Sequence, residues 1–274
     1  MNYQYDLIII GDSKEGNQLI KNIASTTSFI NIAFVSREFK STTTHDFLNV
    51  DYIKDEVVLT DYKNRLFGCY LKSGSRLYAT HLVFAVGQKY APFTINNKKV
   101  PNVFNTAVDI SKEAKKLPVV VLVQTEADVS MAFDVAKKYK YAYLCLDEFS
   151  GKVSEKVNKK LQSKTSSNIV VLPNTRIKKV LPYDETLMKV ELDNYSTVLC
   201  AAIYVKTEAS PDTTCVPPRA GLIKADETGY LETNDKLEST LVPKCFAIGS
   251  CTQKCTKKMI DNLVEVILTD FGGN

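Results

Sequence analysis

The chain opens with an apolar block, a short polar turn and an amphipathic segment. Leu7 to Ile10 is uninterrupted apolar sequence, which is typical of a strand buried on both faces of a parallel sheet. After the turn, apolar residues recur at helical spacing from Leu19 to Ile23, on a helix expected to begin near Lys14. A second strand is expected over residues 30–35. The pattern predicts the strand, turn, helix and strand with which a βαβ unit begins.

The same order occurs again in the middle of the chain. Val119 to Val123 is a second apolar block, and a polar turn separates it from a helical pattern over residues 129–139. The next strand is expected at Tyr141 to Leu146, and a further helix near residues 154–163. Between the two units, residues 39–50 are polar and threonine-rich, which indicates a surface loop. An antiparallel meander is then expected, with strands at 57–59, 66–71 and 76–80.

The first turn, Gly11-Asp12-Ser13, has part of the glycine pattern of dinucleotide-binding turns. Gly11 permits a sharp turn and Gly16 lets the helix lie close to the strand. Ser13 stands where a further glycine would let the backbone approach a pyrophosphate, which a helix N-terminus attracts. Two glycines of three also occur in α/β turns that bind no nucleotide, so both interpretations stay open.

The C-terminal part of the chain returns to the first unit in our interpretation. Residues 242–251 predict another buried strand, and residues 256–270 predict a helix. The predicted fold class is α/β, with two tandem dinucleotide-binding domains that are Rossmann-like and three-layered, the second inserted in the first. We place the first domain at residues 1–108 plus 216–274 and the second at 109–215.

Composition narrows the function classes. The 274 residues are 45% hydrophobic and 24% charged, which is ordinary for a globular protein of one large or two modest domains. The net charge is +4 and the lysines are scattered, so we expect no nucleic-acid partner. No apolar run approaches the roughly 20 residues of a membrane helix, and we see no signal-peptide pattern. Seven cysteines, an odd number, favour a reducing cytoplasm, and two histidines give no reason to expect a metal site.

Four segments together resemble a known family. They are Leu82-Val-Phe-Ala-Val-Gly87, Val100-Pro-Asn-Val-Phe104, Glu208-Ala-Ser-Pro-Asp-Thr213 and Val242 to Cys251. In order and spacing they are similar to four segments of that family. The first closes the flavin-binding half, the second crosses to the second module, the third follows the second module, and the fourth touches the flavin. The proteins concerned are the two-domain flavoproteins of the thioredoxin reductase and pyridine nucleotide-disulfide oxidoreductase group. The resemblance covers nearly the whole chain.

The resemblance implies that FAD binds to the first domain. The positions that it assigns to the cofactor are Gly11, Asp12, Ser13, Gly16, Ser36, Arg37, Ala85, Gly87, Gly249 and Ser250. Besides Ser13, three residues depart from the family pattern, because Ser36 replaces the ribose-binding acid, Val86 replaces a threonine and Ser250 replaces the aspartate of the ribityl contact. Serine still donates and accepts hydrogen bonds, so FAD remains the expected cofactor.

The second module departs further from the family. Its turn, residues 124–129, contains no glycine, and Glu126 and Asp128 would repel a pyrophosphate. Asp147 and Glu148 stand where the resemblance places the arginines for the NADPH phosphate. We therefore expect no use of NADPH. Whether the module is kept only as architecture or holds another ligand stays open.

The thiols limit the redox chemistry, because the chain has no Cys-x-x-Cys motif. The closest pair is Cys251 and Cys255, before the last helix, whose N-terminus points toward the flavin in this family. That helix and Lys254, Lys257 and Lys258 are expected to lower the pKa of a thiol. Cys251 would be the flavin-facing redox thiol and Cys255 its partner. The alternative is two unreactive cysteines, and the cysteines in apolar strands are expected to be core.

The resemblance and these departures imply a FAD-dependent, thioredoxin reductase-like disulfide oxidoreductase. It would pass electrons between the flavin and a thiol, a disulfide or a protein partner, without NADPH. Ferredoxin-linked and diflavin relatives of thioredoxin reductase are the nearest analogy, because they also lack the nicotinamide motifs. The expected partners are a small redox protein or a low-molecular-weight disulfide, and a second copy in a homodimer. The alternative is a catalytically silent scaffold or binding protein derived from this fold.

Overall fold

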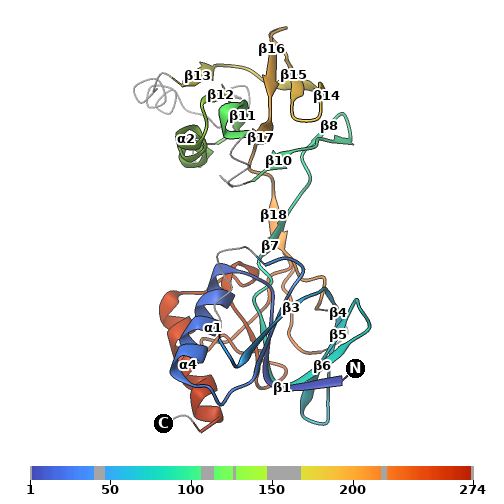
Figure 1. Cartoon of the computed structure of the whole chain (residues 1–274), viewed down its shortest axis with the longest axis vertical. Coiled ribbons are helices and arrows are strands. Elements are labelled where there is room, and N and C mark those ends of the chain that lie inside the picture. The colour runs from blue at the N-terminus through green and yellow to red at the C-terminus, as the bar shows by residue number, and fades with distance from the viewer. Residues whose placement is uncertain are drawn as a thin grey trace. The chain divides into compact units, whose positions relative to one another are not determined.

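The structure, a computed structural model, describes residues 2–39, 47–105, 114–125, 128–146, 168–216 and 221–272. The chain divides into two compact units, coloured along the sequence in Figure 1. Unit 1 comprises residues 1–89 and 209–274, and unit 2 comprises residues 90–208. These boundaries lie earlier than the ones that the sequence predicted. The reason is that β10 (Val103–Phe104) pairs with β17 (Ala202–Tyr204), so the segment before residue 108 already belongs to unit 2.

Unit 1 is built on a seven-stranded sheet with the order β3-β2-β1-β6-β5-β4, in which β19 also pairs with β6. The strands are β1 (Asn2–Ile10), β2 (Ile32–Ser36), β3 (Val50–Lys54), β4 (Val57–Lys63), β5 (Leu66–Leu71), β6 (Arg76–Phe84) and β19 (Cys245–Ala247). The pairs between β3, β2, β1, β6 and β19 are parallel, whereas those of β4 with β5 and of β5 with β6 are antiparallel.

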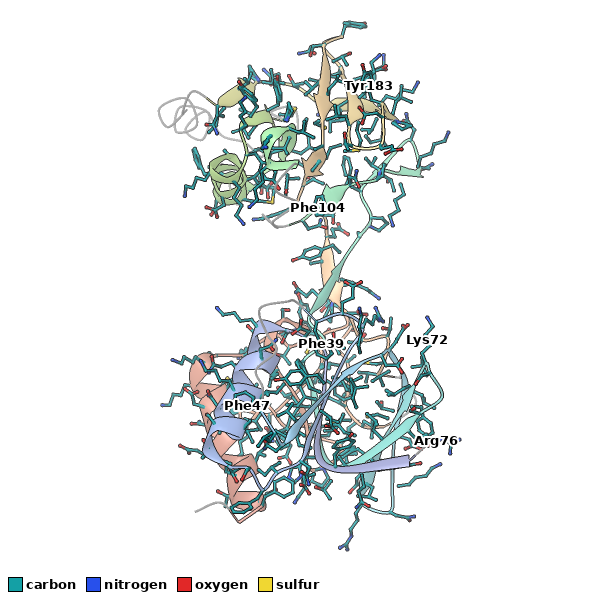
Figure 2. The ribbon with its side chains drawn as sticks, in the orientation of Figure 1. Phe39, Phe47, Lys72, Arg76, Phe104 and Tyr183 are labelled. Atoms are coloured by element: carbon teal, nitrogen blue, oxygen red, sulfur yellow. The ribbon has the colours of Figure 1, made fainter. Side chains whose placement is uncertain are left out.

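Both faces of this sheet are covered, which explains the continuous apolar run of β1. Leu7 and Ile9 face the helices α1 (Lys14–Thr26) and α4 (Lys257–Asp270), which lie side by side in Figure 1. Ile8 and Ile10 face the opposite core, because side chains alternate along a strand. Phe39 and Phe47, labelled in Figure 2, pack against the helix-side core. The predicted buried strand and amphipathic helix are confirmed.

Two predicted details of unit 1 are wrong. The strand expected at 76–80 continues to Phe84 as β6, whose first half pairs with β5 and whose second half pairs with β19. The strand β3 was not predicted, since it is an edge strand with exposed Asp51 and Lys54 and so lacks a long apolar run. Of the predicted loop over 39–50, residues 40–46 lie outside the described part of the chain.

Unit 2 contains a parallel sheet with the order β10-β17-β11-β12-β13 and an antiparallel sheet of β14, β15 and β16. The remaining strands are β8 (Thr94–Ile95), β9 (Lys98–Lys99), β11 (Pro118–Val123), β12 (Tyr141–Leu146), β13 (Ile169–Leu172), β14 (Ile177–Pro182), β15 (Met188–Leu192) and β16 (Thr197–Cys200). Helix α2 (Asp128–Lys138) covers one face of the parallel sheet, and the antiparallel sheet packs on the other. A short 3₁₀ turn, η1 (Ala114–Lys116), precedes β11. The helix predicted at 154–163 lies outside the described residues.

The chain passes between the units through two short strands, β7 (Gln88–Tyr90) and β18 (Ala209–Pro211), which pair with each other. The amide of Ala91 donates to the carbonyl of Glu208 at 2.8 Å, and the amide of Asp212 donates to that of Gly87 at 3.1 Å. These two bonds require an antiparallel ladder. None of the helices in the described ranges has the length and apolar character needed to cross a membrane.

Candidate functional site

The carboxyl ends of β1 and β2 border a cavity of about 120 Å³ in unit 1, which we call the strand-end crevice. Open α/β sheets bind ligands at this edge. Its apolar lining consists of Ile10, Val35, Val57, Val86 and Cys215, together with Gly11. Its polar lining consists of Asp12, Ser36, Arg37, Asp55, Asp212 and Thr214. An apolar wall with a few polar groups suits a planar ring that carries hydroxyl groups.

Two glycines set the shape of the turn after β1. Gly11 has a φ of +101°, and a Cβ atom on it would lie 2.5 Å from the carbonyl oxygen of Ala85. On Gly16, a Cβ would lie 2.9 Å from the Cβ of Ala85, so the start of α1 packs directly on the segment after β6. Gly11 and Gly16 therefore have the turn and packing roles that the sequence predicted for them.

The N-terminus of α1 is capped by its own side chains. The Ser13 hydroxyl accepts a hydrogen bond from the Gly16 amide at 3.0 Å, as an N-cap residue does. The Asn17 side-chain amide donates to Asp12 Oδ1 and to the Ser13 carbonyl oxygen. The serine in place of a glycine thus has a structural use, and the Asp12 carboxylate lies at the positive end of the helix dipole.

The turn after β19 approaches the first turn of α1. Gly249 has a φ of +76°, and a Cβ on it would lie 2.7 Å from Glu15 Oε2. The Glu15 carboxyl group therefore lies against Gly249, a contact that sequence reasoning missed. Gly87 has a φ of +72°, and a Cβ there would lie 4.0 Å from the hydroxyl of the exposed Ser250. The structure thus brings the predicted residues of both strand ends to one side of the sheet.

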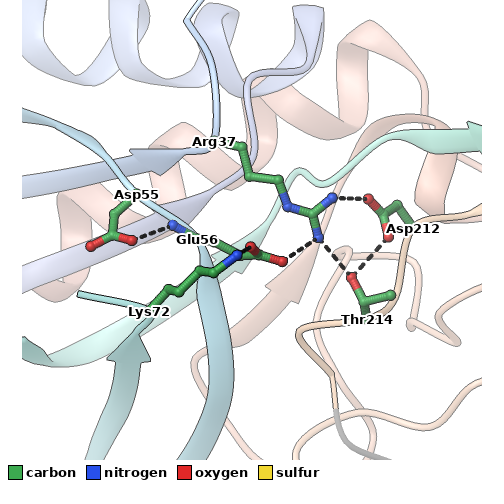
Figure 3. Close-up of polar contacts among 6 residues, drawn as sticks. All are labelled: Arg37, Asp55, Glu56, Lys72, Asp212 and Thr214. Atoms are coloured by element: carbon green, nitrogen blue, oxygen red, sulfur yellow. Dashed lines mark hydrogen bonds and ion pairs between the residues drawn. The ribbon is translucent and has the colours of Figure 1, made fainter. Parts of the chain in front are cut away.

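Arg37, which lines the crevice, ties three separate segments of unit 1 together (Figure 3). Its Nη2 atom lies 3.2 Å from Glu56 Oε1, in the turn between β3 and β4. Its Nη1 atom lies 3.4 Å from Asp212 Oδ2, and Nη2 donates to Thr214 Oγ1 at 3.1 Å. Lys72 adds a second cation, 3.2 Å from Glu56 Oε2. Of these ionic groups, Arg37 and Asp212 line the crevice, although they come from distant parts of the chain.

Two further polar residues of the crevice lining, Ser36 and Asp55, form hydrogen bonds within their own turns. The Ser36 hydroxyl donates to the Glu38 carbonyl oxygen at 2.8 Å. Asp55 Oδ1 accepts from the Glu56 amide at 2.7 Å. Burial raises the pKa of Asp55, but hydrogen bonds from Ser73 and from the Glu56 amide outweigh it, so the pKa is lowered and the group is ionised at neutral pH. Sequence reasoning found Ser36 and Arg37 but missed the carboxylates, since they come from elsewhere in the chain.

Comparison with known protein families decides the classification. The sequence model of the pyridine nucleotide-disulphide oxidoreductase family matches residues 2–265. The chain belongs to the pyridine nucleotide-disulphide oxidoreductase family. No curated protein matches it.

Solved structures agree in fold with this family. Thioredoxin reductase of Lactococcus lactis is similar with a TM-score of 0.67 and 12% identity, over 97% of this chain and 98% of that one. Thioredoxin reductase of T. acidophilum has the same TM-score and identity, over 98% and 99%. A cysteine-to-serine mutant of the HOCl-induced flavoprotein disulfide reductase RclA of Escherichia coli, as a Cu(II) complex, has a TM-score of 0.66 and 14% identity, over 100% of this chain and 72% of that one. The thioredoxin reductase-like fold is therefore shown.

Cys255 directly precedes Thr256, the N-cap residue of α4, and Cys251 lies four residues further back in the chain. Cys251 belongs to the 3₁₀ turn η3 (Gly249–Cys251) and is fully buried, and its thiol donates to the Ile248 carbonyl oxygen at 3.1 Å. Burial raises its pKa to about 12, although the amides of Val86 and Gly87 lower it. Burial also raises the pKa of the half-buried Cys255. The expected direction of the pKa shift is wrong, because the thiols face the core and not the lysines. The redox role of the pair stays a prediction.

The other cysteines are core residues, as predicted for most of them. Cys69, Cys145, Cys200 and Cys245 are fully buried, and burial raises the pKa of each thiol. Cys215, in the wall of the crevice, is also buried, with a pKa of about 12. All seven cysteines are free thiols.

In unit 2, Asp128 closes the turn between β11 and α2. Its Oδ2 atom accepts from the amides of Gln124 at 3.0 Å and Thr125 at 2.8 Å, and from the Thr125 hydroxyl at 3.0 Å. Lys206 Nζ lies 3.8 Å from Asp128 Oδ1, and only 3% of the surface of Asp128 is exposed. A carboxylate thus takes up amides that could otherwise bind a phosphate. The other predicted acids, Glu126, Asp147 and Glu148, lie outside the described residues.

Proposed function

We propose that the chain is a FAD-dependent oxidoreductase that passes electrons between the flavin and a thiol, a disulfide or a protein redox partner, without NADPH. The observation that carries this proposal is the strand-end crevice of unit 1, with its apolar wall, polar rim and close approach of Gly11 to Ala85. An adenine ring with a ribose suits this lining. The donor set therefore fits the adenosine part of FAD.

The residues that would hold FAD come from three places in unit 1. They are Gly11, Asp12, Ser13 and Gly16 at the first turn, Ser36 and Arg37 at the tip of β2, and Ala85, Gly87, Gly249 and Ser250 at the ends of β6 and β19. Glu15 is a flexible, half-buried side chain, so turning it toward solvent frees the surface of Gly249. When bound, FAD supplies the carrier of electrons. Ile10, Val35 and Val86 exclude water from the wall, and Arg37 orders the rim.

Two further observations support electron transfer without NADPH and with an external partner. The buried carboxylate of Asp128 takes up the amides of Gln124 and Thr125, which disfavours a second nucleotide phosphate in unit 2. The Cys251 thiol is buried, and its pKa of about 12 keeps it protonated at neutral pH. The electron acceptor or donor in this proposal is therefore a small redox protein or a low-molecular-weight disulfide.

Reconstitution with FAD tests the proposal directly. We expect purified full-length chain to bind one FAD, with a protein-dependent change in flavin fluorescence, and to give yellow protein after removal of free flavin. Dithionite should bleach the bound flavin rapidly in anaerobic stopped-flow traces, whereas NADPH should not. Failure to bind flavin after refolding with FAD would refute the cofactor assignment, and fast bleaching by NADPH would refute the proposed independence from NADPH.

The second candidate is a binding protein of this fold without redox chemistry. Three observations favour it: the Ser13 hydroxyl already caps α1, Glu15 lies on Gly249, and the thiols are protonated. The same reconstitution separates the two candidates, because a colourless protein that never takes up flavin supports the silent one.

We also propose a reducing compartment, the cytoplasm, and a homodimer. Seven free cysteines in one chain support the first, because an oxidising compartment would pair them. The homodimer rests on the fold relationship alone. Sedimentation equilibrium of the reconstituted protein tests it, and a monomer at micromolar concentration would refute it.

A further inference from the structure

The strand-end crevice contains an acid that reaches it from a distant part of the chain. The tip of β2 carries Ser36 in place of the carboxylate that dinucleotide folds use for a ribose hydroxyl. Asp212, which follows β18, lines the same crevice as Ser36 and Arg37. Its amide donates to the Gly87 carbonyl oxygen at 3.1 Å, which fixes its backbone next to the end of the β6–β7 connection.

The Asp212 carboxylate is held in place and still has capacity to accept hydrogen bonds. Thr214 Oγ1 donates to Oδ1 at 2.9 Å, and Arg37 Nη1 lies 3.4 Å from Oδ2 (Figure 3). About a fifth of the side chain, 21%, is exposed. A carboxylate has about four acceptor positions, so two partners leave room for a hydroxyl donor. Because Thr214 and Arg37 already restrain the Asp212 side chain, a ligand that binds to it causes a smaller loss of conformational entropy.

The other two carboxylates of the crevice have local tasks. Asp12 Oδ1 accepts the side-chain amide of Asn17 on α1. Asp55 Oδ1 accepts a hydrogen bond from the Glu56 amide, as Figure 3 shows. The partners of Asp212, Arg37 and Thr214, themselves line the crevice.

The charge balance of the crevice favours a neutral sugar over a phosphorylated one. Its lining has three carboxylates, Asp12, Asp55 and Asp212, and one guanidinium, Arg37, which already faces Glu56 and Asp212. A 2′-phosphate on the ribose would add negative charge beside these carboxylates, which is unfavourable. A free hydroxyl donates to a carboxylate and forms a charge-assisted hydrogen bond.

We propose that Asp212 accepts a hydrogen bond from a ribose hydroxyl of an adenine nucleotide bound in the strand-end crevice, in place of the acid that Ser36 replaces. Arg37 is a positioning residue that holds Asp212 and does not serve as a phosphate ligand. The inference rests on the proposed function in so far as FAD is the nucleotide concerned. It selects nucleotides with an unmodified ribose diol.

Calorimetric titration of the full-length chain with sugar-modified nucleotides tests this inference. The probes are ADP, 2′-deoxy-ADP, 3′-deoxy-ADP and adenosine 2′,5′-bisphosphate, with FAD titrated separately. We expect ADP to bind about tenfold more tightly than at least one deoxy analogue, as for a lost hydrogen bond to a charged group. The 2′,5′-bisphosphate should bind at least about tenfold more weakly than ADP, because the crevice repels its 2′-phosphate.

Variants assign the preference to the residues. In Asp212→Ala the preference for ADP over the deoxy analogue should fall to within about twofold, and in Arg37→Met it should fall partly, with recovery in Arg37→Lys. Asp212→Asn keeps the shape if the alanine variant does not fold, and should weaken the preference. The matched control is Glu232→Gln, which breaks an exposed ion pair with Lys224 outside the crevice lining and should leave the preference unchanged.

Each outcome has a defined meaning. An unchanged preference in Asp212→Ala, no preference in the wild type, or no binding of ADP overturns the inference. Tighter binding of the 2′,5′-bisphosphate than of ADP also overturns it, since Arg37 would then serve a phosphate. If FAD binds but ADP shows no sugar preference, the inference is overturned and the proposed function still stands. A sugar preference for ADP without any FAD binding supports the inference and refutes the proposed cofactor.

Discussion

Burial decides the behaviour of the thiols at the scale of single residues. Cys251 is fully buried, with its S–H directed at backbone carbonyls, whereas Cys255 is half-buried. The five other thiols are all buried. A thiol reacts as the thiolate, so a raised pKa and poor access both slow it.

We therefore expect one slow-reacting thiol in the native protein at pH 7.5, titrated with an aromatic disulfide reagent, and seven after unfolding in guanidinium. Cys255→Ser should remove the native reaction, and Cys251→Ser should leave it unchanged. Rapid modification of Cys251 in the native state would contradict this expectation and would restore its candidacy as the redox thiol.

Gly11 and Cys251 differ in how far their roles could be predicted from the sequence. The role of Gly11 follows from local geometry, because a turn after a buried strand needs a positive φ wherever the chain goes next. The environment of Cys251 depends on which side of η3 faces the core, and neither spacing nor nearby lysines determine that. Asp212 was missed for the same reason, since its place in the crevice depends on tertiary structure.

At the scale of elements, the turn between β1 and α1 should tolerate substitution poorly. Gly11→Ala places a Cβ 2.5 Å from the Ala85 carbonyl oxygen at a φ of +101°, so we expect it to destabilise the protein by about 2 kcal/mol or more in urea unfolding. Gly74→Ala is the matched control, because its φ of +90° is similar but a Cβ there meets no atom within 4 Å. It should lose only about 1 kcal/mol. Equal losses would show that the close approach is unimportant.

The end of α4 is joined to β6 through a buried histidine. His81 Nε2 lies 3.0 Å from Asp270 Oδ2, Nδ1 lies 2.9 Å from Thr80 Oγ1, and the ring packs on Phe271. Burial lowers the pKa of His81 below 6.5, more than the hydrogen bond to Asp270 raises it, and Lys244 lowers it further. Asp6 acts weakly in the opposite direction. The folded protein therefore keeps this ring neutral at pH values where the unfolded chain is protonated.

The free energy of unfolding should consequently depend on pH. The unfolded chain takes up a proton near pH 6.5 and the folded protein only at lower pH, so the free energy of unfolding should be full above pH 6.5 and fall as the pH decreases through it. Urea titrations at pH 7.5 and 5.5 measure this difference. In His81→Gln the difference should shrink. An unchanged pH dependence in that variant would assign the effect to other groups.

Long patterned elements could be predicted from the sequence and short ones could not. The blocks at β11 and β12 and the start of α1 were expected within one position of their observed bounds. The end of β1 was also expected, but the strand begins at Asn2, five residues before the apolar block. The edge strand β3 lacks such a pattern because one of its sides is unpaired and polar. The 3₁₀ turn η3 is too short to leave a period.

At the scale of the whole molecule, the two units use the same sheet edge in different ways. In unit 1 the edge is an open crevice with mixed charge, and in unit 2 Asp128 fills the corresponding turn with its own carboxylate. The residues of the crevice lining all belong to unit 1, on both of its chain segments. A nucleotide site in unit 1 therefore does not need residues of unit 2 in its lining.

The topology permits a direct test of this independence. The antiparallel bonds from Ala91 to Glu208 and from Asp212 to Gly87 bring the two crossings side by side, so a two-residue Asn-Gly turn can join residue 91 to residue 208. We expect the shortened chain to unfold cooperatively and to bind ADP or FAD within about threefold of the full chain, since a short turn adds little closure entropy. Asp212→Ala in the shortened chain is the control for specific binding, and it should again remove the preference for an intact ribose. A folded but non-binding product would mean that unit 2 contributes to the site.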